Sequence, residues 1–507
     1  MKCAIAVVFC AVSVYAGNSI NPDAVELKPL PVPVGFRSDM DRPVAFDETA
    51  VVRVTCPDAY ALQWLASHFI EWYGKSAPKV AEGTGTPVLM DGAEAYTVKA
   101  DASGVKIAAR SLAGVRWAAY TLRQLAIAKR GQFRTNAHIL PTLELSDSPH
   151  LSFRAVHLCW FPEVRPQQME RAIRLAALLK FNYAIIDPWG MYESKKHPWW
   201  HWPKPTMTKE RIRRLVAIGR DLGITLIPQI NTYGHATASR TSTLKHSVID
   251  IRPQYASLFE PGGWNWCVSN PQTQRVLRDL IAEMHDDFGR PPFFHLGCDE
   301  AQPPSCPECR RVPNGELVSR HIAGLARFLR GRGARAMIWH DMLLRRGDAR
   351  WKGFIACGTK ETAKMADTLP KDIIVCDWQY QYGQTTQVCR EWPTLAYFRE
   401  KGFPVCGCPF TNYNSMKPMA DFISGNGGFG FIATTWNCLF GVHWVKLYTA
   451  ASSAAWGTAS GSLGLHGDTP QFNTRFANAL RLVGHDMKVD DYLDTGHLNH
   501  QMQPVFW

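Results

Sequence analysis

The chain has 507 residues, of which 46% are hydrophobic, so it can bury at least one large core and is too long for one ordinary domain. Its formal net charge is +12, but its basic clusters fall on expected helices or at helix ends. Solvated helix faces explain these clusters without nucleic acid as a partner. The 18 tryptophans are unusual for this length and favour carbohydrate, because aromatic faces suit the apolar C–H surfaces of sugar rings.

The first sixteen residues predict a secretory signal peptide. Lys2 supplies the positive end, Cys3 to Tyr15 form a short apolar run, and Ala16 ends a small-residue cleavage pattern. We therefore expect a secreted or periplasmic location. No later apolar run reaches the roughly 18 residues of a spanning helix, so no membrane span is expected. The remaining cysteines sit largely in strand-like apolar runs, which predicts small buried hydrophobes rather than a dense disulfide framework.

The rest of the chain divides into an extended lead-in, a small domain and a larger domain. Residues 17–48 contain several prolines and predict the lead-in. Residues 49–147 predict a small α+β domain without evident chemistry. Its expected strands are Val51–Thr55, Ala95–Val98 and Val105–Ala108, and its expected helices are Ala59–Tyr73 and Gly114–Ala128.

From residue 148 to 460, short β-rich runs alternate with amphipathic helical segments, which is typical of βα units and a parallel sheet. Eight strands are expected, namely Ala155–Trp160, Tyr183–Asp187, Thr225–Asn231, Phe293–Cys298, Ala336–His340, Ile373–Trp378, Pro404–Cys408 and Phe431–Trp436. Eight such units close a (β/α)8 TIM barrel of the α/β class, with a doubly wound open sheet as the alternative. Residues 461–507 form a C-terminal tail of unknown role.

Polar residues end most of the expected barrel strands, where the active site of a (β/α)8 barrel lies. The central candidates are Asp299 and Glu300, which follow a glycine and the fourth strand. Cleavage of a glycosidic bond needs a proton donor and an anionic or nucleophilic group beside an oxocarbenium-like centre. Adjacent carboxyls disfavour double ionisation, so one of them can hold a proton and act as a general acid.

The run His295-Leu-Gly-Cys-Asp-Glu300 resembles the His-x-Gly-Gly-Asp-Glu signature of glycoside hydrolase family 20, the β-N-acetylhexosaminidases. The segment from Pro228 to Ala236 is similar to the family's third-strand segment ending in Gly-His-Ala. Trp266–Pro271, Ile338–Leu343 and Cys306-Pro-Glu-Cys309 resemble the hexosaminidase D branch. The resemblance spans roughly residues 50 to 457, including a non-catalytic domain before the barrel.

The resemblance implies retaining, exo-acting removal of terminal N-acetylglucosamine or N-acetylgalactosamine by substrate-assisted catalysis, in which the sugar's own acetamido oxygen attacks the anomeric carbon. Glu300 would be the acid and base, and Asp299 would orient the acetamido group. The implied partner is an oligosaccharide or glycoconjugate with a terminal N-acetylhexosamine, whether sulfated or not, and no cofactor or metal is expected. The candidate substrate-binding residues are Arg154, Asp187, His235, His295, Trp339, Trp378, Tyr380, Tyr413, Trp436 and Asn437.

These candidates have different expected roles. Tyr413 would donate to the acetamido oxygen, with Tyr380 as its competitor, and the three tryptophans would wall the sugar. Arg154 would bind ring hydroxyls, with a structural ion pair as the alternative, and His235 would tune the acids. The aromatic segment 197–202 would either stack a second sugar or form a packed lid.

The sequence departs from the family pattern at three places beside the site. The second-strand pattern of histidines followed by paired aspartates is missing, which leaves Asp187 as the only comparable acid. Cys298 replaces the second glycine of the signature, which we expect to tighten the pocket. Asn437 and Cys438 follow Trp436 where many members have Trp-x-Glu, which changes the groups available to the far edge of the sugar.

Two other functions are compatible with these residues. A metal-dependent hydrolase would need a centre built from His235, His295, Cys298, Asp299, His340 and Asp341, whose spacing matches no compact zinc pattern. A glycan-binding protein on a degenerate barrel would have no need for the retained acid pair. The Cys306-x-x-Cys309 motif taken alone is half of a metal site or a local disulfide.

Overall fold

The computed structural model describes most of the small domain and the barrel. The described residues are 29–33, 36–84, 91–128, 138–161, 164–201, 203–237, 248–380, 388–410, 412–436 and 443–457. The expected signal peptide, the expected tail at 461–507 and Asn437 lie outside them.

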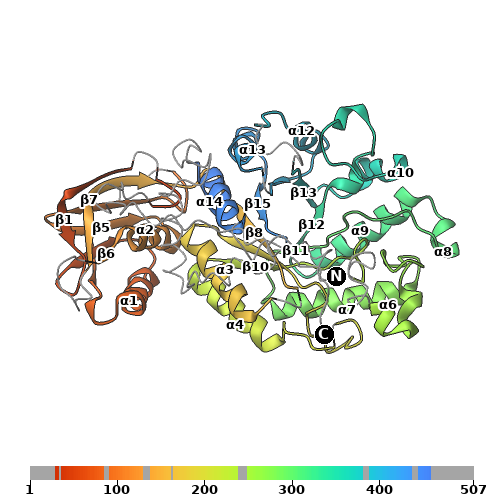
Figure 1. Ribbon diagram of the computed structural model, residues 1–507, viewed down its shortest axis with the longest axis horizontal. Coiled ribbons are helices and arrows are strands. Elements are labelled where there is room, and N and C mark those ends of the chain that lie inside the picture. Colours follow the sequence, from red (N-terminus) through yellow and green to blue (C-terminus); the bar gives the residue numbers. More distant parts are fainter. Residues whose placement is uncertain are drawn as a thin grey trace, which may run out of the picture.

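The small domain is a seven-stranded sheet with two helices packed on it (Figure 1, left). Its strands follow the order β1-β7-β4-β5-β2-β3, and β6 pairs with β7. The strands are β1 Arg37–Ala45, β2 Val51–Thr55, β3 Lys79–Glu82, β4 Tyr96–Asp101, β5 Gly104–Ala109, β6 Ile127–Ala128 and β7 His138–Asp147. The helices are α1 Tyr60–Tyr73 and α2 Leu112–Leu125, with the 3-10 turn η1 Gly74–Ser76. The α+β character predicted for this domain is confirmed.

One strand lies where the sequence predicts an extended lead-in. β1 pairs antiparallel with β7, so residues 37–45 belong to the sheet of the small domain. Seven of its nine side chains are exposed, and its composition is polar. Such a strand is held by backbone hydrogen bonds to its neighbour and leaves no alternating apolar pattern in the sequence.

The larger domain is the predicted barrel (Figure 1, centre and right). Its strands are β8 Arg154–Cys159, β9 Tyr183–Asp187, β10 Thr225–Pro228, β11 Phe293–His295, β12 Arg335–Trp339, β13 Ile374–Trp378, β14 Val405–Cys408 and β15 Gly430–Thr434. All are parallel, β15 pairs with β8, and a bridge between Gln229 and His295 joins β10 to β11 and closes the ring. Each of the eight expected strands is present.

The helices around the barrel follow the strands along the chain. The longer ones are α3 Pro166–Leu178, α4 Lys209–Leu222, α7 Pro271–Asp287, α9 Asn314–Arg330, α12 Pro393–Glu400, α13 Tyr413–Gly425 and α14 His443–Trp456. The short ones are α6 Val248–Ile251, α8 Pro307–Arg310, α10 Lys360–Ala363 and α11 Met365–Thr368, with 3-10 turns η3 Pro253–Leu258, η4 Asp341–Leu343 and η5 Ala349–Trp351.

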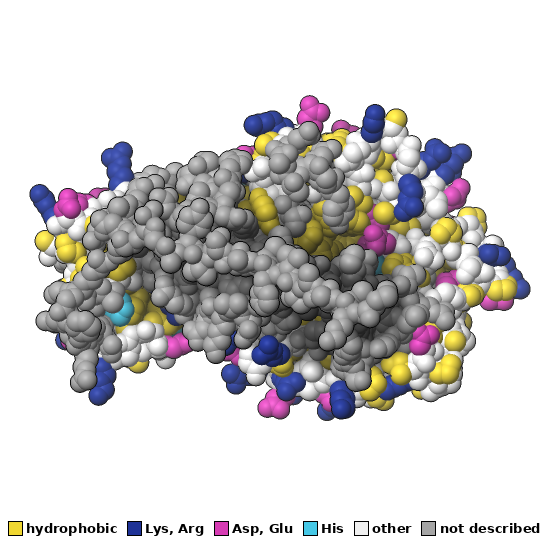
Figure 2. All heavy atoms as spheres, in the orientation of Figure 1, with side chains coloured by type: hydrophobic (Ala, Val, Ile, Leu, Met, Phe, Trp, Pro, Cys, Tyr) yellow, Lys and Arg dark blue, Asp and Glu magenta, His cyan; other side chains and the backbone are white. Residues whose placement is uncertain are grey.

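Branched, aromatic and cysteine side chains fill the inside of the barrel. Ile185, Ile227 and Ile374 form a buried cluster there with Cys376, Cys406 and others, which confirms that these strand cysteines serve as small hydrophobes. On the face drawn in Figure 2, Lys and Arg side chains of the coloured residues lie scattered around the rim, several of them beside Asp or Glu. None of the helices in the described ranges has both the length and the hydropathy that crossing a bilayer requires.

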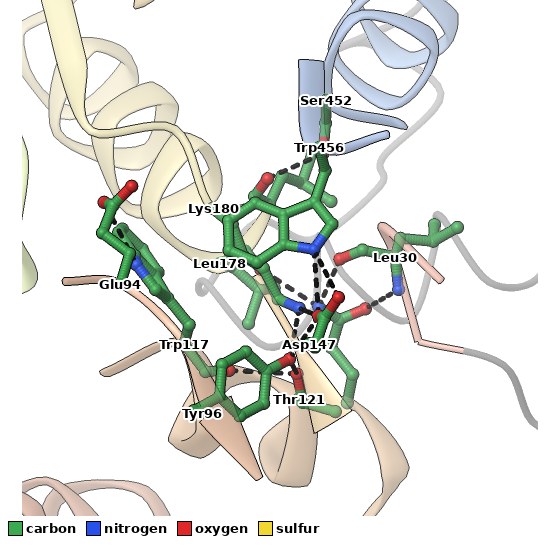
Figure 3. A network of polar contacts seen from close by, with 12 residues as sticks. Leu30, Glu94, Tyr96, Trp117, Thr121, Asp147, Leu178, Lys180, Ser452 and Trp456 are labelled. Carbon is green, nitrogen blue, oxygen red and sulfur yellow. Dashed lines mark hydrogen bonds and ion pairs between the residues drawn. The ribbon is translucent and has the colours of Figure 1, made fainter. Parts of the chain in front are cut away.

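A buried ion pair joins the small domain to the barrel (Figure 3). Asp147, the last residue of β7, lies 3.2 Å from Nζ of Lys180, and neither side chain is exposed. The Trp456 indole at the end of α14 donates to both oxygens of Asp147, at 3.0 and 2.9 Å. Tyr96 donates its hydroxyl to Asp147 at 2.8 Å, and the Lys180 ammonium donates to Tyr96 at 2.7 Å. Four distant parts of the chain therefore meet at one carboxylate.

Replacing Lys180 by methionine is expected to lower the free energy of unfolding by about 3 to 5 kcal/mol, because it leaves the Asp147 carboxylate buried without its cation. The matched control is Arg320→Gln, which breaks an exposed pair with Glu316 and should cost about 0.5 kcal/mol or less. Thermal and denaturant unfolding of both variants measures the difference. Equal stability of the two variants would show that the buried pair is not a structural anchor.

Candidate active site

Asp299 and Glu300 lie directly after β11, at the carboxyl ends of the barrel strands. The Asp299 side chain is 8% exposed and that of Glu300 is 44% exposed, so one is held inside and the other reaches solvent. Nε2 of His235 lies 3.4 Å from Oδ2 of Asp299 and 3.3 Å from Oε2 of Glu300. The structure therefore brings the predicted acid pair and the predicted tuning histidine into direct contact.

Two glycines permit this close approach of the loops after β10 and β11. A Cβ atom on Gly234 would lie 2.1 Å from the carbonyl oxygen of Asp299, and one on Gly297 would lie 2.2 Å from Oδ1 of Asn231. Both distances are shorter than any tolerable contact. Gly297 also has a φ of +65°, which suits a residue without a Cβ.

The backbone around the site is strained. Five non-glycine residues at the strand ends have positive φ values: Trp189 (+40°), His235 (+54°), Cys298 (+76°), Glu300 (+47°) and Trp436 (+44°). Side chains other than glycine adopt this conformation only where surrounding contacts enforce it, and such residues cluster at functional sites. The strand predicted for 293–298 ends at His295 because the next residues turn into this conformation.

A third acid, Asp341, supports the catalytic segment. Its Oδ2 accepts the backbone N–H of Glu300 at 2.9 Å, and its Oδ1 accepts the Trp378 indole N–H at 3.3 Å. Asp341 is fully buried at the end of β12. The sequence reasoning noted its position at a strand end but considered it only as a metal ligand, since its contact with the Glu300 backbone leaves no local signal.

Asp187 lies at the end of β9, as predicted, and is buried. Its Oδ2 accepts the side-chain amide N–H of Gln229 at 2.8 Å, and Asn231 approaches the same oxygen at 3.5 Å. A pocket opens beside it, lined by Asp187, Trp189, Trp200, Asn231 and His235 among others. Asp187 thus belongs to the wall of this pocket.

The electrostatics of the group centre on His235. Burial opposes its protonation, but Asp299 and Glu300 outweigh that effect and raise the pKa of His235 to about 10. Burial together with the charge of Asp299 raises the pKa of Asp341 to about 6. Burial likewise raises the pKa of Asp187 to about 7. At neutral pH an imidazolium therefore lies between the two catalytic carboxyls.

Aromatic side chains form a wall on one side of the site. Trp378 and Tyr380 have ring centroids 5.0 Å apart, and Trp339 and Trp436 have centroids 5.8 Å apart. The Trp436 indole donates to the Tyr380 hydroxyl at 2.6 Å, which links the two pairs. The three predicted tryptophans and Tyr380 are thus brought together at the ends of β12, β13 and β15.

Other predicted residues lie beside or below this group. Tyr413 is the first residue of α13 and is partly buried. His295 is completely buried under the ring of Trp339, at 4.3 Å between centroids, and burial holds its pKa well below the ordinary value. Its Nδ1 accepts the N–H of Gly297 at 3.0 Å, so it braces the loop from beneath. The sulfur of Cys298 lies 3.2 Å from the Thr232 hydroxyl and is buried beneath the loop, which does not support the expected tightening of the pocket.

Arg154 is not part of this site. It begins β8, at the amino ends of the barrel strands, and is 1% exposed. Its guanidinium pairs with both oxygens of Glu94, at 2.7 and 3.1 Å, and donates to the Lys180 carbonyl at 2.9 Å. The expected contact with ring hydroxyls is therefore corrected in favour of the structural ion pair, because the side chain is fully used at the opposite end of the barrel.

Trp264 is a neighbour that the sequence reasoning missed. Its indole donates to the Glu300 carbonyl at 2.8 Å, and its ring lies 4.4 Å from that of His235. In the predicted aromatic segment 197–202, Trp200 lines the pocket, Trp199 stacks on Tyr255 at 4.2 Å, and Trp202 lies outside the described residues. Within that segment, Trp199 is packed against the protein and Trp200 lines the pocket.

The six residues of the metal-centre alternative do not form one cluster. Within the described ranges, two groups bring three or more metal-ligating atoms within 4.8 Å of one another. One consists of His157, Cys159 and Asp187, and the other consists of Glu260, Cys267, Cys306 and Cys309. Neither group contains Asp299 or Glu300.

Comparison with known proteins gives consistent matches. A model described as the glycosyl hydrolase family 20 catalytic domain matches residues 182–394, and one for domain 2 of the same family matches residues 26–148. A beta-hexosaminidase subunit beta from Entamoeba histolytica is 27% identical over 41% of this chain and 38% of its own length. A beta-hexosaminidase from Porphyromonas gingivalis is 26% identical over 49% of this chain and 36% of its own length. The chain thus matches well under half the length of these two relatives.

The fold has close neighbours among solved structures. The family 20 exo β-N-acetylglucosaminidase from Vibrio harveyi, in complex with N-acetylglucosamine, superposes with a TM-score of 0.65 at 18% identity, over 91% of this chain and 78% of that one. The two family models together span well over half of the sequence. The chain therefore belongs to glycosyl hydrolase family 20.

Proposed function

We propose that this protein is a retaining, exo-acting β-N-acetylhexosaminidase that removes terminal N-acetylglucosamine or N-acetylgalactosamine by substrate-assisted catalysis. The observation that carries the proposal is the contact of Asp299 and Glu300 with the same ring nitrogen of His235, with one carboxyl buried and the other open to solvent. Membership of family 20 and the exo-acting neighbour from Vibrio harveyi support it.

Glu300 is placed to exchange protons with the leaving group and with water. Its side chain is the more exposed of the pair, while its backbone N–H and carbonyl are held by Asp341 and Trp264. A proton donor must reach the glycosidic oxygen and keep its direction during the reaction. We assign to Glu300 protonation of the leaving oxygen and then deprotonation of the water that opens the intermediate.

Asp299 is placed to act on the acetamido group. It is nearly buried, and its Oδ2 lies 3.4 Å from Nε2 of His235. An oriented carboxylate in a site with little water stabilises positive charge more strongly than it would in solvent. In this proposal Asp299 accepts a hydrogen bond from the acetamido N–H of the sugar. It also stabilises the oxazolinium that forms when the acetamido oxygen attacks the anomeric carbon.

The aromatic wall completes the subsite for the acetamido methyl group and the sugar ring. Trp339, Trp378 and Trp436 supply flat apolar surfaces, which suit C–H groups. Tyr380, hydrogen-bonded to Trp436, and Tyr413, at the start of α13, are the two candidates for donating to the acetamido oxygen. We propose further that the protein acts outside the cytoplasm, as its first sixteen residues suggest, and that sulfated glycans are among its substrates in view of the charge of +12.

The decisive test is a panel of aryl β-glycosides, including 6-sulfated members, that differ at carbon 2. We expect kcat/KM for the 2-acetamido sugars to exceed that for the matching 2-hydroxyl sugars by at least about 100-fold, because only the former carry the nucleophile. Asp299→Asn should remove most of this preference. Equal rates for both series would refute substrate assistance, and absence of hydrolysis with retained binding would favour the glycan-binding alternative.

Replacing Glu300 by glutamine should lower kcat by about 10² to 10⁴-fold for glycosides with alkyl leaving groups, since these need a proton. Substrates with a strongly acidic phenol as leaving group should lose much less in the first step. The contrast is measured in kcat/KM, which reports the first step alone, because the second step also needs Glu300 and is the same for every leaving group. The exposed Glu316→Gln serves as the matched control. A uniform loss of kcat/KM for all leaving groups would assign Glu300 another role.

The charge on His235 predicts a pH dependence of stability. Its pKa is about 10 in the folded chain and about 6.5 in an unfolded one, so folding binds a proton between these values. The stabilisation is complete below about pH 6.5 and is lost as the pH rises towards 10. The difference in Tm between the native protein and His235→Gln should shrink over this range. A difference that stays constant with pH would show that His235 is neutral.

A further inference from the structure

Three cysteines and one glutamate converge outside the acid pair, and the proposed reaction uses none of them. Glu260 and Cys267 belong to the segment between β10 and α7, whereas Cys306 and Cys309 lie after β11, where Cys309 is part of α8. Their ligand atoms all lie within 4.8 Å of one another. The Cys-x-x-Cys motif thus meets a third thiol and a carboxylate that the sequence alone does not connect to it.

The spacing of the sulfur atoms matches a tetrahedral metal site. Sγ of Cys267 lies 3.7 Å from Sγ of Cys306 and 3.8 Å from Sγ of Cys309. Four ligands at a Zn–S distance of about 2.3 Å stand about 3.8 Å apart along each tetrahedral edge. A disulfide would need a separation of about 2.05 Å, and three thiols at comparable separations cannot all pair.

The surroundings hold these side chains in place. Oε2 of Glu260 accepts the backbone N–H groups of Ser305 and Cys306, each at 2.7 Å. Its Oε1 is buried and accepts no hydrogen bond from the described residues. The sulfur of Cys306 accepts the N–H of Cys309 at 3.3 Å. Backbone hydrogen bonds to the ligands are typical support for a metal centre.

We propose that Glu260, Cys267, Cys306 and Cys309 bind one structural Zn²⁺ ion. Thiolates favour Zn²⁺ over hard cations, and four protein ligands leave no open position for a substrate or a reactive water. The ion would be bound as the thiols release their protons, and it would join two loops that otherwise meet through polar contacts.

The position of this site connects it to the catalytic segment. Asn265, between Glu260 and Cys267, exchanges hydrogen bonds with the backbone of Gln302 at 2.6 and 3.2 Å. Its neighbour Trp264 donates to the Glu300 carbonyl. A metal that fixes both loops therefore holds the backbone of the acid residue in place without taking part in the reaction. This last consequence rests on the proposed function, whereas the metal site does not.

The test is metal analysis of the full-length protein expressed with zinc in the medium and purified without chelator. We expect about one Zn²⁺ per chain by mass spectrometry of the elements, and about a fifth of that or less in Cys267→Ser and Cys309→Ser. Cys56→Ser, a partly buried cysteine of the small domain, is the matched control and should keep the full content.

A second measurement uses the native protein and therefore does not depend on the folding of the cysteine variants. Native protein refilled with Co²⁺ should show thiolate-to-cobalt charge transfer and the absorption bands of tetrahedral cobalt. Glu260→Gln should weaken Co²⁺ binding with all thiols retained. A native protein that contains no zinc, takes up no cobalt, or has a disulfide among these cysteines by peptide mapping would overturn the proposal. None of these readouts requires the enzyme to be active, so failure of the metal site is distinguishable from failure of the proposed function.

Discussion

The structure depends on the buried pair of Asp147 and Lys180, where the small domain meets the barrel. Removing two charges from water is costly unless each finds partners, and here Tyr96 and Trp456 supply the remaining hydrogen bonds of the carboxylate. Because Trp456 ends the last described helix and Lys180 follows the first barrel helix, the pair also brings the two ends of the barrel together. Because its partners come from both domains, the pair holds the small domain against the barrel. The Arg154–Glu94 pair lies at the same interface.

Buried charged groups also meet at the opposite end of the barrel, where the acid pair lies. Asp299 and Glu300 both contact His235, and Asp187 lies in the wall of the same pocket. Positive φ values at His235, Cys298 and Glu300 show that the backbone of this segment is strained. Asp341 accepts the Glu300 N–H and Trp264 donates to the Glu300 carbonyl, and these two hydrogen bonds hold the strained segment in place. The reactive carboxyls are thus kept oriented by residues that lie far apart along the chain.

Local patterns predicted the elements well wherever packing is repetitive. All eight barrel strands are short apolar runs because each is buried, and the helices between them have apolar periodicity because each covers one side of the sheet. β1 escaped prediction because its side chains face solvent and only its backbone pairs. The resemblance predicted a substrate contact for Arg154, but this residue begins β8, and its side chain therefore lies at the end of the barrel opposite the acid pair.

The sequence by itself determined the fold class, the family and the acid pair, because the alternation of apolar runs with amphipathic helices and the motif from His295 to Glu300 are properties of contiguous residues. Only the tertiary structure decided which residues support that pair. Asp341, Trp264 and Gln229 reach the site from loops after other strands, and the thiol of Cys267 meets Cys306 and Cys309 from 39 and 42 residues away. Contacts of this kind depend on how the barrel closes and on how its loops pack, and neither leaves a periodic trace along the chain.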